Sequence, residues 1–180
     1  TALSFPPAGP RDSQGLNVVG ISTGLPLAGN DGTGSGVLAT EYRIGQAEYR
    51  LASQNIVSSS AVREVSFRSW DRDGNLEVTR TTHVHVDAAP PAVSGLFPAG
   101  GEIFMAGRDS FTVAWLLEDD LDHAPTAQAR LIHASTSIAV GRGDLIDAAA
   151  LPEGDWVLEV VARDWVFNST TTYGLPFRIA

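Results

Sequence analysis

The chain has 180 residues, of which 43% are hydrophobic, and it contains no cysteine. Its formal net charge is −9, and all twelve basic residues are arginine. This composition excludes disulfides, zinc–thiolate sites and cysteine nucleophiles, and it argues against nucleic acid and anionic membrane surfaces, because both need clustered positive charge on the protein.

The first half of the chain predicts short strands separated by turns. Residues 1–16 are rich in Pro, Gly and Ser, and residues 24–36 end in the turn-forming run NDGTGSG, so both predict loops. Apolar or alternating segments predict strands over residues 17–22, 37–44, 47–51, 55–57, 63–70 and 76–86. No segment reaches the roughly 18 apolar residues that a membrane-spanning helix needs.

The run DAAPP at residues 87–91 predicts a domain boundary. Two consecutive prolines favour an extended and stiff connection. We therefore expect one module at residues 1–87, a short linker at 88–91 and a second module at 92–180.

The second half predicts the same kind of structure. Strands are expected over residues 92–97, 110–117, 127–133, 138–141, 156–163 and 171–179. Residues 145–151 (LIDAAAL) have helical character but are too short for more than a single turn.

An internal repeat supports this division. Residues 65–87 and 158–180 fall into register when one is shifted by 93 positions. The shift aligns Asp71 with Asp164, Asn75 with Asn168, Val84 with Phe177, and Val86 with Ile179. Each copy reads as a strand, a turn of form Asp-x-x-x-Asn and a second strand, and the period is close to the size of one immunoglobulin-like domain.

Strand alternation assigns the faces of the predicted sheets. Trp156, Leu158, Val160 and Ala162 share one face, which leaves Glu159 and Arg163 on the other. Val84 and Val86 should point inward, which places His83 and His85 on the outer face. The predicted core residues are Val19, Tyr42, Phe67 and Val86 in the first module and Trp115, Trp156, Val160 and Phe177 in the second.

Two segments resemble fibronectin type III and related bacterial Ig-like domains. Residues 151–162 (LPEGDWVLEVVA) resemble the turn, corner aromatic and strand near the end of such a domain, with Trp156 at the corner usually held by Tyr. Residues 110–115 (SFTVAW) resemble its early strand, which ends in a core Trp. The first module is similar to bacterial Ig-like repeats through residues 31–37, 41–44 and 67–75, although Arg63 stands at its corner position.

The resemblance implies an all-β chain of two tandem Ig-like or fibronectin III-like β-sandwiches. It further implies a non-catalytic accessory or spacer role in a secreted or cell-surface protein. No known nucleophile, metalloprotease or phosphate-binding motif is present, which agrees with a protein that is not an enzyme.

Asp71, Asp73 and Asn75 form a candidate calcium loop, because alternating carboxylates around a Gly turn can supply several oxygen ligands. An EF-hand is excluded, since the twelfth position holds Thr82. The alternative is a hairpin turn in which the Asp side chains cap backbone N–H groups. The repeat favours that alternative, because the second copy has no middle Asp.

Two further clusters are weaker metal candidates. The acidic run at residues 118–122 (EDDLD) could gather a cation or face a basic partner, but a solvated loop explains it better. His83 and His85 have a spacing that can hold zinc, and two exposed strand residues are the favoured alternative. No cofactor is expected apart from possible calcium.

Trp70 and Trp165 adjoin the two aligned turns and are the candidate carbohydrate contacts, since exposed aromatic rings stack on sugar faces. The alternative is ordinary packing at a hairpin edge. The sequence Asn168-Ser-Thr170 matches a glycosylation signal, but Asn168 already has a turn role in the repeat.

The predicted function is that of a structural or adhesive module pair, acting as a spacer or protein-interaction segment. The alternative is a pair of carbohydrate-binding modules attached to an extracellular polysaccharide-degrading enzyme, and a hydrolase is a third and weaker hypothesis. The expected partners are neighbouring domains of a longer chain and a surface protein or polysaccharide, without nucleic acid and without membrane insertion.

Overall fold

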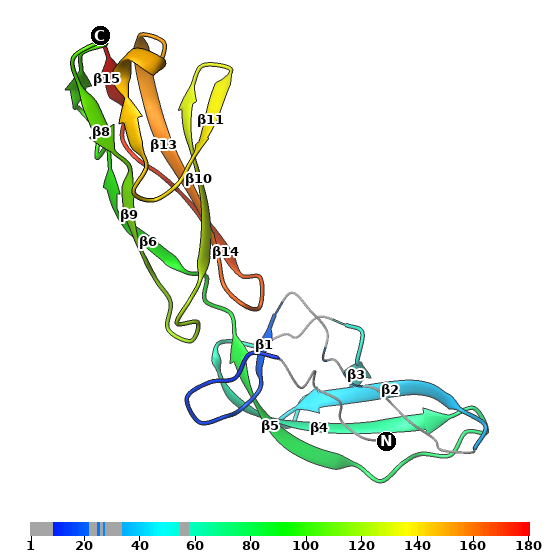
Figure 1. The fold of residues 1–180 in the computed structure, drawn as a ribbon. Helices are drawn as coiled ribbons and strands as arrows, with labels where there is room; N and C mark the ends of the chain where they lie inside the picture. The colour runs from blue at the N-terminus through cyan, green and yellow to red at the C-terminus, as the bar shows by residue number, and fades with distance from the viewer. Residues whose placement is uncertain (1–8, 22–24, 26, 28–33, 55–57) are drawn as a thin grey trace. The chain divides into compact units, whose positions relative to one another are not determined.

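The structure, a computed structural model, describes residues 9–21, 25, 27, 34–54 and 58–180. These residues form strands and turns with a single turn of 3-10 helix, and the chain divides into two compact units, Thr1–Ala89 and Pro90–Ala180 (Figure 1). The division falls within the predicted linker at residues 88–91. In this described part, no helix has the length and apolarity needed to cross a membrane.

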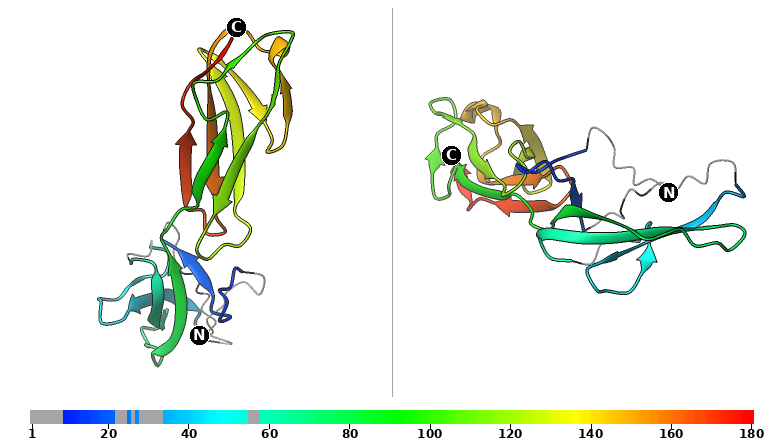
Figure 2. Two further views of the ribbon diagram at one scale, coloured as in Figure 1. Left: turned by 90° about the vertical axis from the view of Figure 1, so that its left-hand side faces the viewer. Right: turned by 90° about the horizontal axis from the view of Figure 1, so that it is seen from below.

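The first unit contains one five-stranded sheet. Its strands are β1 (Val18–Gly20), β2 (Val37–Ile44), β3 (Arg50–Leu51), β4 (Ala61–Asp71) and β5 (Arg80–Asp87). The order across the sheet is β1-β5-β4-β2-β3, with β1 parallel to β5 and the other neighbours antiparallel. Figure 1 shows β2, β4 and β5 side by side, and Figure 2 shows the same strands from two further directions.

The inner face of this sheet carries the predicted core. Val19, Tyr42, Phe67 and Val86 are all buried, so their assignment is confirmed. They pack with Leu25, Ala52, Val65 and Val84. Val65 and Phe67 are two residues apart on β4, which is the spacing that places side chains on one face of a strand.

The second unit contains ten strands and one helical turn. They are β6 (Ala92–Phe97), β7 (Ile103–Phe104), β8 (Ser110–Thr112), β9 (Ala114–Glu118), β10 (Thr126–His133), β11 (Thr136–Val140), β12 (Leu145–Asp147), η1 (Ala148–Ala150), β13 (Gly154–Arg163), β14 (Ser169–Tyr173) and β15 (Phe177–Ile179).

These strands form a β-sandwich. One layer has the order β11-β10-β13-β15-β7, and β14 pairs with the second half of β13. The other layer consists of the pairs β6-β9 and β8-β12, and its strand β6 contacts β13 and β14. This is the Ig-like and fibronectin III-like arrangement, in which two antiparallel sheets enclose one core, so the predicted all-β, Ig-like fold class is confirmed. The described residues of the first unit form one sheet, so a second sandwich there stays a prediction.

The core of the sandwich includes the four residues predicted for it. Trp115, Trp156, Val160 and Phe177 are buried together with Leu131, Leu158 and Ile179. The indole nitrogen of Trp156 donates a hydrogen bond to the Pro152 carbonyl at 2.9 Å. This bond matches the one that a corner tyrosine makes to backbone a few residues upstream.

The internal repeat corresponds to an equivalent sheet in each unit. The first unit has the order β3-β2-β4-β5-β1 and the second has β11-β10-β13-β15-β7. In both, the last strand runs parallel to its neighbour. The aligned pairs Val84 and Phe177, and Val86 and Ile179, are buried in their respective cores, so the repeat reflects a shared hairpin.

Some predicted strands differ from the observed ones at identifiable residues. The predicted strand over residues 110–117 is divided at Val113, where β8 pairs with β12 and β9 pairs with β6. The strand over residues 171–179 is divided at residues 174–176 (GLP), because Pro176 has no N–H to donate to a ladder. The strand over residues 76–86 begins only at Arg80.

Shorter elements were placed less well. Strand β7 was not predicted, and only Arg50–Leu51 of residues 47–51 form a strand. Residues 145–151 begin as β12, and their helical character is limited to Ala148–Ala150. The predicted strand at residues 55–57 lies outside the described residues, as does Ser22 at the end of the first predicted strand.

Candidate functional site

The two aligned turns have the same geometry. In the first, Oδ1 of Asp71 accepts hydrogen bonds from the backbone N–H groups of Asp73 and Asn75, and Oδ2 accepts one from the Asn75 side chain. In the second, Oδ1 of Asp164 accepts from Val166 and Asn168, and Oδ2 accepts from the Asn168 side chain. The Asp-x-x-x-Asn pattern therefore closes both hairpins through one carboxylate.

The same turn places its carboxylate in two different environments. Hydrogen bonds, led by that from the Asn75 side chain, hold the pKa of Asp71 below its ordinary value. Burial raises the pKa of Asp164 above its ordinary value, and the nearby Asp119 carboxylate adds to this effect. The Asp164 residue is only 5% exposed. The surroundings, and not the turn itself, therefore decide the direction of the shift.

The calcium candidate is part of the first of these turns. Both carboxylate oxygens of Asp71 already accept hydrogen bonds from the turn, while Asp73 and Asn75 are exposed. Within the described ranges, no group of three or more His, Asp or Glu side chains is arranged to hold a metal ion. Calcium binding at Asp71, Asp73 and Asn75 stays a prediction.

The two turns carry different residues at the position just before the Asn, where the backbone is left-handed. Gly74 in the first has a φ of 86°, and Phe167 in the second has a φ of 70°. This left-handed backbone region suits glycine, whereas a residue with a Cβ adopts it at a cost of about 1–2 kcal/mol. The Phe167 side chain is 63% exposed, so core packing does not offset the strain.

The acidic run at residues 118–122 is largely used to shape a loop. Oδ1 of Asp119 accepts from the N–H groups of Leu121 and Asp122, and Oδ1 of Asp122 accepts from Ala124. The expectation of a fully solvated loop is wrong for Asp122, which is 2% exposed. A short Asp side chain folded back onto its own loop is shielded by that loop.

The two histidines of β5 differ in their surroundings. His83 is exposed as predicted, whereas His85 is partly covered and its Nδ1 lies 2.8 Å from Oδ2 of Asp12. Burial raises the pKa of Asp12, but hydrogen bonds from His85, Leu16 and Gln14 outweigh it and leave the pKa below its ordinary value. The Asp12 contact, and not a zinc pairing with His83, determines where the His85 ring lies.

Trp70 belongs to a polar network on the outer face of the first unit. Its indole N–H and the Arg68 Nε both donate to Oε2 of Glu41, at 3.3 and 3.1 Å. The Arg68 guanidinium also lies 3.8 Å from the ring centroid of Tyr49. Trp70 is therefore held in place at the end of a row of aromatic and charged side chains, and it is partly exposed.

The outer face of the second unit carries a comparable network. Arg130 contacts Glu159 through Nε at 2.5 Å and through its terminal nitrogen at 3.2 Å. The hydrogen bond from Arg130, with a further one from Tyr173, holds the pKa of Glu159 below its ordinary value. Glu159 lies on the predicted outer face but is only 4% exposed, because these partners cover it.

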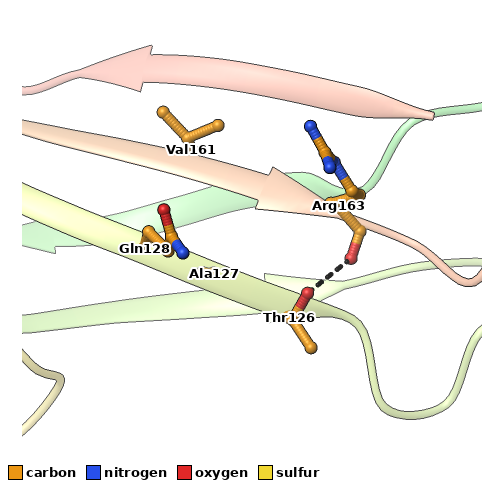
Figure 3. A pocket seen from close by; sticks show the side chains of 5 residues that line it. All are labelled: Thr126, Ala127, Gln128, Val161 and Arg163. Carbon is orange, nitrogen blue, oxygen red and sulfur yellow. Dashed lines mark hydrogen bonds between the residues drawn. The ribbon is translucent and has the colours of Figure 1, made fainter. Parts of the chain in front are cut away.

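A pocket of about 160 Å³ lies between β10 and β13 beside this network. It is lined by Thr126, Ala127, Gln128, Val161 and Arg163. Figure 3 shows the Gln128, Val161 and Arg163 side chains on the same side of the two strands, and the Thr126 hydroxyl donates to the Arg163 carbonyl at 3.3 Å (Figure 3). Trp165, two residues after Arg163 in the chain, is 37% exposed.

Several residues of these networks were not predicted as site residues from the sequence. Glu41, Arg68 and Tyr49 come from separate strands and loops, and nothing in their local pattern indicates that they meet. Phe167 stands at the position that the aligned first turn fills with Gly74. A residue with a Cβ at a position where the aligned turn has glycine is therefore a signal, readable from the sequence, that could have pointed to Phe167.

Comparisons with known proteins give structural likeness alone. No protein-family model matches the chain, and no curated protein matches it either. A structure of Clostridium thermocellum CbhA fibronectin(III)-like modules is similar, at 12% identity and a TM-score of 0.44, over 99% of this chain and 94% of that one.

Two other solved structures are similar at lower TM-scores. They are Drosophila N-cadherin EC1-3 (12% identity, 97% of this chain, 65% of that one, TM-score 0.35) and the D00-D0 domain of intimin (12%, 92%, 95%, 0.30).

Proposed function

We propose that the chain is a non-catalytic pair of Ig-like modules from a secreted or cell-surface protein, where it acts as a spacer or protein-interaction segment. In this role it connects and presents neighbouring domains of a longer polypeptide. The proposal rests on how the chain uses its ionisable side chains.

Ten of the carboxylates in the described residues hold the backbone in shape. Each of the following accepts a hydrogen bond from a backbone N–H of a nearby turn or loop: Asp12, Asp71, Asp87, Glu102, Asp109, Asp119, Asp122, Asp144, Asp147 and Asp164. Glu41 and Glu159 are engaged by arginines across neighbouring strands. Carboxylates that close turns or pair strands have a structural role, as in a scaffold. A catalytic acid or base would instead have to face its substrate.

Surface display tests the spacer role. The chain is inserted between a cell-surface anchor and an epitope tag, and antibody labelling of intact cells is compared with that of the anchor fused directly to the tag. We expect stronger labelling with the chain present. A Trp156→Ala insert controls for folding, and equal labelling with and without the folded chain would contradict the proposal.

A second candidate function is carbohydrate binding, and the Glu41 network of the first unit favours it. A partly exposed indole that is fixed by a hydrogen bond loses little freedom when a ligand stacks against it. Arg68 and Tyr49 extend the same surface with further polar and aromatic groups.

Retention on insoluble polysaccharides tests this candidate. We expect a Trp70→Ala variant on β4 to lose retention. His83→Ala, on β5 and on the outer face of the same sheet, should keep it. Repeating the assay with EDTA tests calcium at Asp71, Asp73 and Asn75, because chelation should weaken retention only if the ion shapes the site. Release of soluble sugar during incubation would contradict the non-catalytic assignment.

A further inference from the structure

The turn between β13 and β14 carries an aromatic side chain in a position that its counterpart fills with glycine. Phe167 takes a left-handed backbone conformation and exposes 63% of its surface, although Gly74 closes the equivalent turn in the first unit without a side chain. An exposed aromatic kept at a strained position is the kind of departure that accompanies binding sites.

The neighbours of Phe167 supply complementary chemistry. The Arg163 guanidinium lies over its ring, 5.9 Å from the centroid, and Trp165 is partly exposed in the same turn. In the part of the chain that the structure describes, no carboxylate forms an ion pair with Arg163.

Arg163 also lines the pocket between β10 and β13. The pocket offers the Gln128 amide and the Thr126 hydroxyl around an apolar floor at Val161 (Figure 3). A broader depression of about 800 Å³ adjoins it and shares Ala127, Gln128 and Val161. The combined surface spans residues of β10, β11 and β13. Its lining includes Gln128, Arg130 and Arg163 as well as smaller residues, which suits an extended polar ligand.

We propose that this surface binds a glycan through a carboxylate-bearing sugar unit, an inference that deepens the carbohydrate-binding candidate and places its site in the second unit. Arg163 pairs with the sugar carboxylate, since guanidinium and carboxylate form the strong charge-assisted hydrogen bonds. The Phe167 ring stacks against the apolar face of a sugar ring, and Gln128 and Thr126 bond to hydroxyl groups.

An acidic peptide offers the same charge, but the surface fits it less well. Peptide and protein partners concentrate their affinity in aromatic or arginine anchors that fill deep pockets. This depression is broad, and Gln128, Arg130 and Ser137 are among the residues that line it, so it offers hydrogen-bonding groups and no deep pocket for such an anchor.

NMR titration of the whole chain with oligogalacturonate at physiological ionic strength tests the proposal. We expect shifts confined to the β13–β14 turn and the Thr126–Gln128 segment. Arg163→Gln should weaken binding at least tenfold, and Phe167→Gly should weaken it several-fold without lowering the melting temperature, because glycine suits the backbone at that position.

Three controls make the result decisive. Arg142→Gln removes the same charge from an exposed turn elsewhere in the second unit and should leave binding unchanged. The methyl ester of the same oligosaccharide should bind at least tenfold more weakly, and equal binding would overturn the role of the carboxylate. Binding of poly-glutamate as tightly as oligogalacturonate would overturn the glycan assignment in favour of an acidic peptide.

Absence of any oligogalacturonate-dependent shift would overturn the proposal outright. The display experiment on the spacer role does not depend on this surface, so the two proposals fail separately. Retention through Trp70 in the first unit is also independent, because neither Arg163→Gln nor Phe167→Gly alters that network.

Discussion

The side chain of Trp156 combines complete burial with a hydrogen bond to the Pro152 carbonyl. Both terms contribute to the stability of the second unit, and two substitutions separate them. Trp156→Ala removes both, whereas Trp156→Phe keeps an aromatic ring in the core and removes only the indole and its N–H.

We predict that Trp156→Ala lowers the free energy of unfolding of the second unit by about 3–5 kcal/mol, the range for truncating a large buried aromatic. Trp156→Phe should lower the free energy of unfolding by less. Its cost is about 1 kcal/mol for the lost hydrogen bond, plus the cost of replacing the indole with a smaller ring. Urea denaturation followed by circular dichroism measures both. An unchanged midpoint in the alanine variant would show that this residue is not in the core.

The pKa values of the Asp71 and Asp164 carboxyls should lie on opposite sides of the ordinary aspartate value. Hydrogen bonding holds the pKa of Asp71 low, and burial raises that of Asp164. Carboxyl-carbon NMR during an acid titration should therefore give a higher midpoint for Asp164 than for Asp71. Equal midpoints would mean that the turn alone sets the pKa.

The sign of the stability effect follows from linkage. Asp71, with its lowered pKa, stabilises the fold above the unfolded-state pKa, and this contribution is lost as the pH falls through the folded-state pKa. Asp164, with its raised pKa, destabilises the fold at a pH above its folded-state pKa, where the buried carboxyl is charged. This cost disappears as the pH falls below the unfolded-state pKa. The second turn is therefore the more acid-tolerant of the two.

At the scale of elements, the start of β13 depends on Gly154. This glycine has a φ of 131°, and a Cβ there would collide with the His133 ring. That ring stacks on Trp156 with centroids 4.9 Å apart, and its Nδ1 lies 2.8 Å from the Asp155 carbonyl oxygen. Glycine thus lets β10 approach β13 closely beside the corner residue.

We predict that Gly154→Ala destabilises the second unit by more than about 1 kcal/mol and alters tryptophan fluorescence, because His133 must leave its stack. Gly107→Ala is the matched control. Gly107 also has a positive φ, at 75°, but a Cβ there meets nothing within 4 Å, so it reports the backbone strain alone. Equal costs for the two variants would remove the steric role of His133.

The elements that could be predicted are those with a repeated pattern. Alternation on β4 and β13 identified Phe67, Val160 and their neighbours as core, and the aligned Asp-x-x-x-Asn turns located both hairpins. Strand β7 has two residues, which is too short for any period to show. The division at Val113 and the burial of Glu159 arise from strand pairing, which local sequence does not specify.

The candidate sites were predictable to a smaller degree. The sequence pointed to Trp70 and Trp165 through their position beside the turns, but the hydrogen-bond partner of Trp70, Glu41, comes from another strand. The Asp12–His85 contact joins residues 73 positions apart, and Glu41 and Trp70 are separated by 29 positions. Such contacts follow from the completed fold and have no local signal.

At the scale of the molecule, the described core of the second unit is complete in itself. Its buried residues come from both layers of one sandwich, and they include the large aromatic residues Trp115, Trp156 and Phe177. We predict that residues 90–180 expressed alone fold and unfold in one cooperative thermal transition, measured by calorimetry. Absence of a transition, or loss of the dispersed amide NMR spectrum of a folded domain, would contradict this boundary.

The short parallel pairs at the sheet edges have a mechanical consequence. In the second unit, β7 lies near the start of the chain segment and β15 near its end, and they are joined by bonds such as that from the Arg178 N–H to the Glu102 carbonyl. In the first unit, β1 and β5 are paired in the same way. Tension applied to the two ends of either unit slides these strands past each other, so their hydrogen bonds are loaded together in shear and are not peeled apart in sequence. Each module is thereby built to resist pulling along its own chain direction.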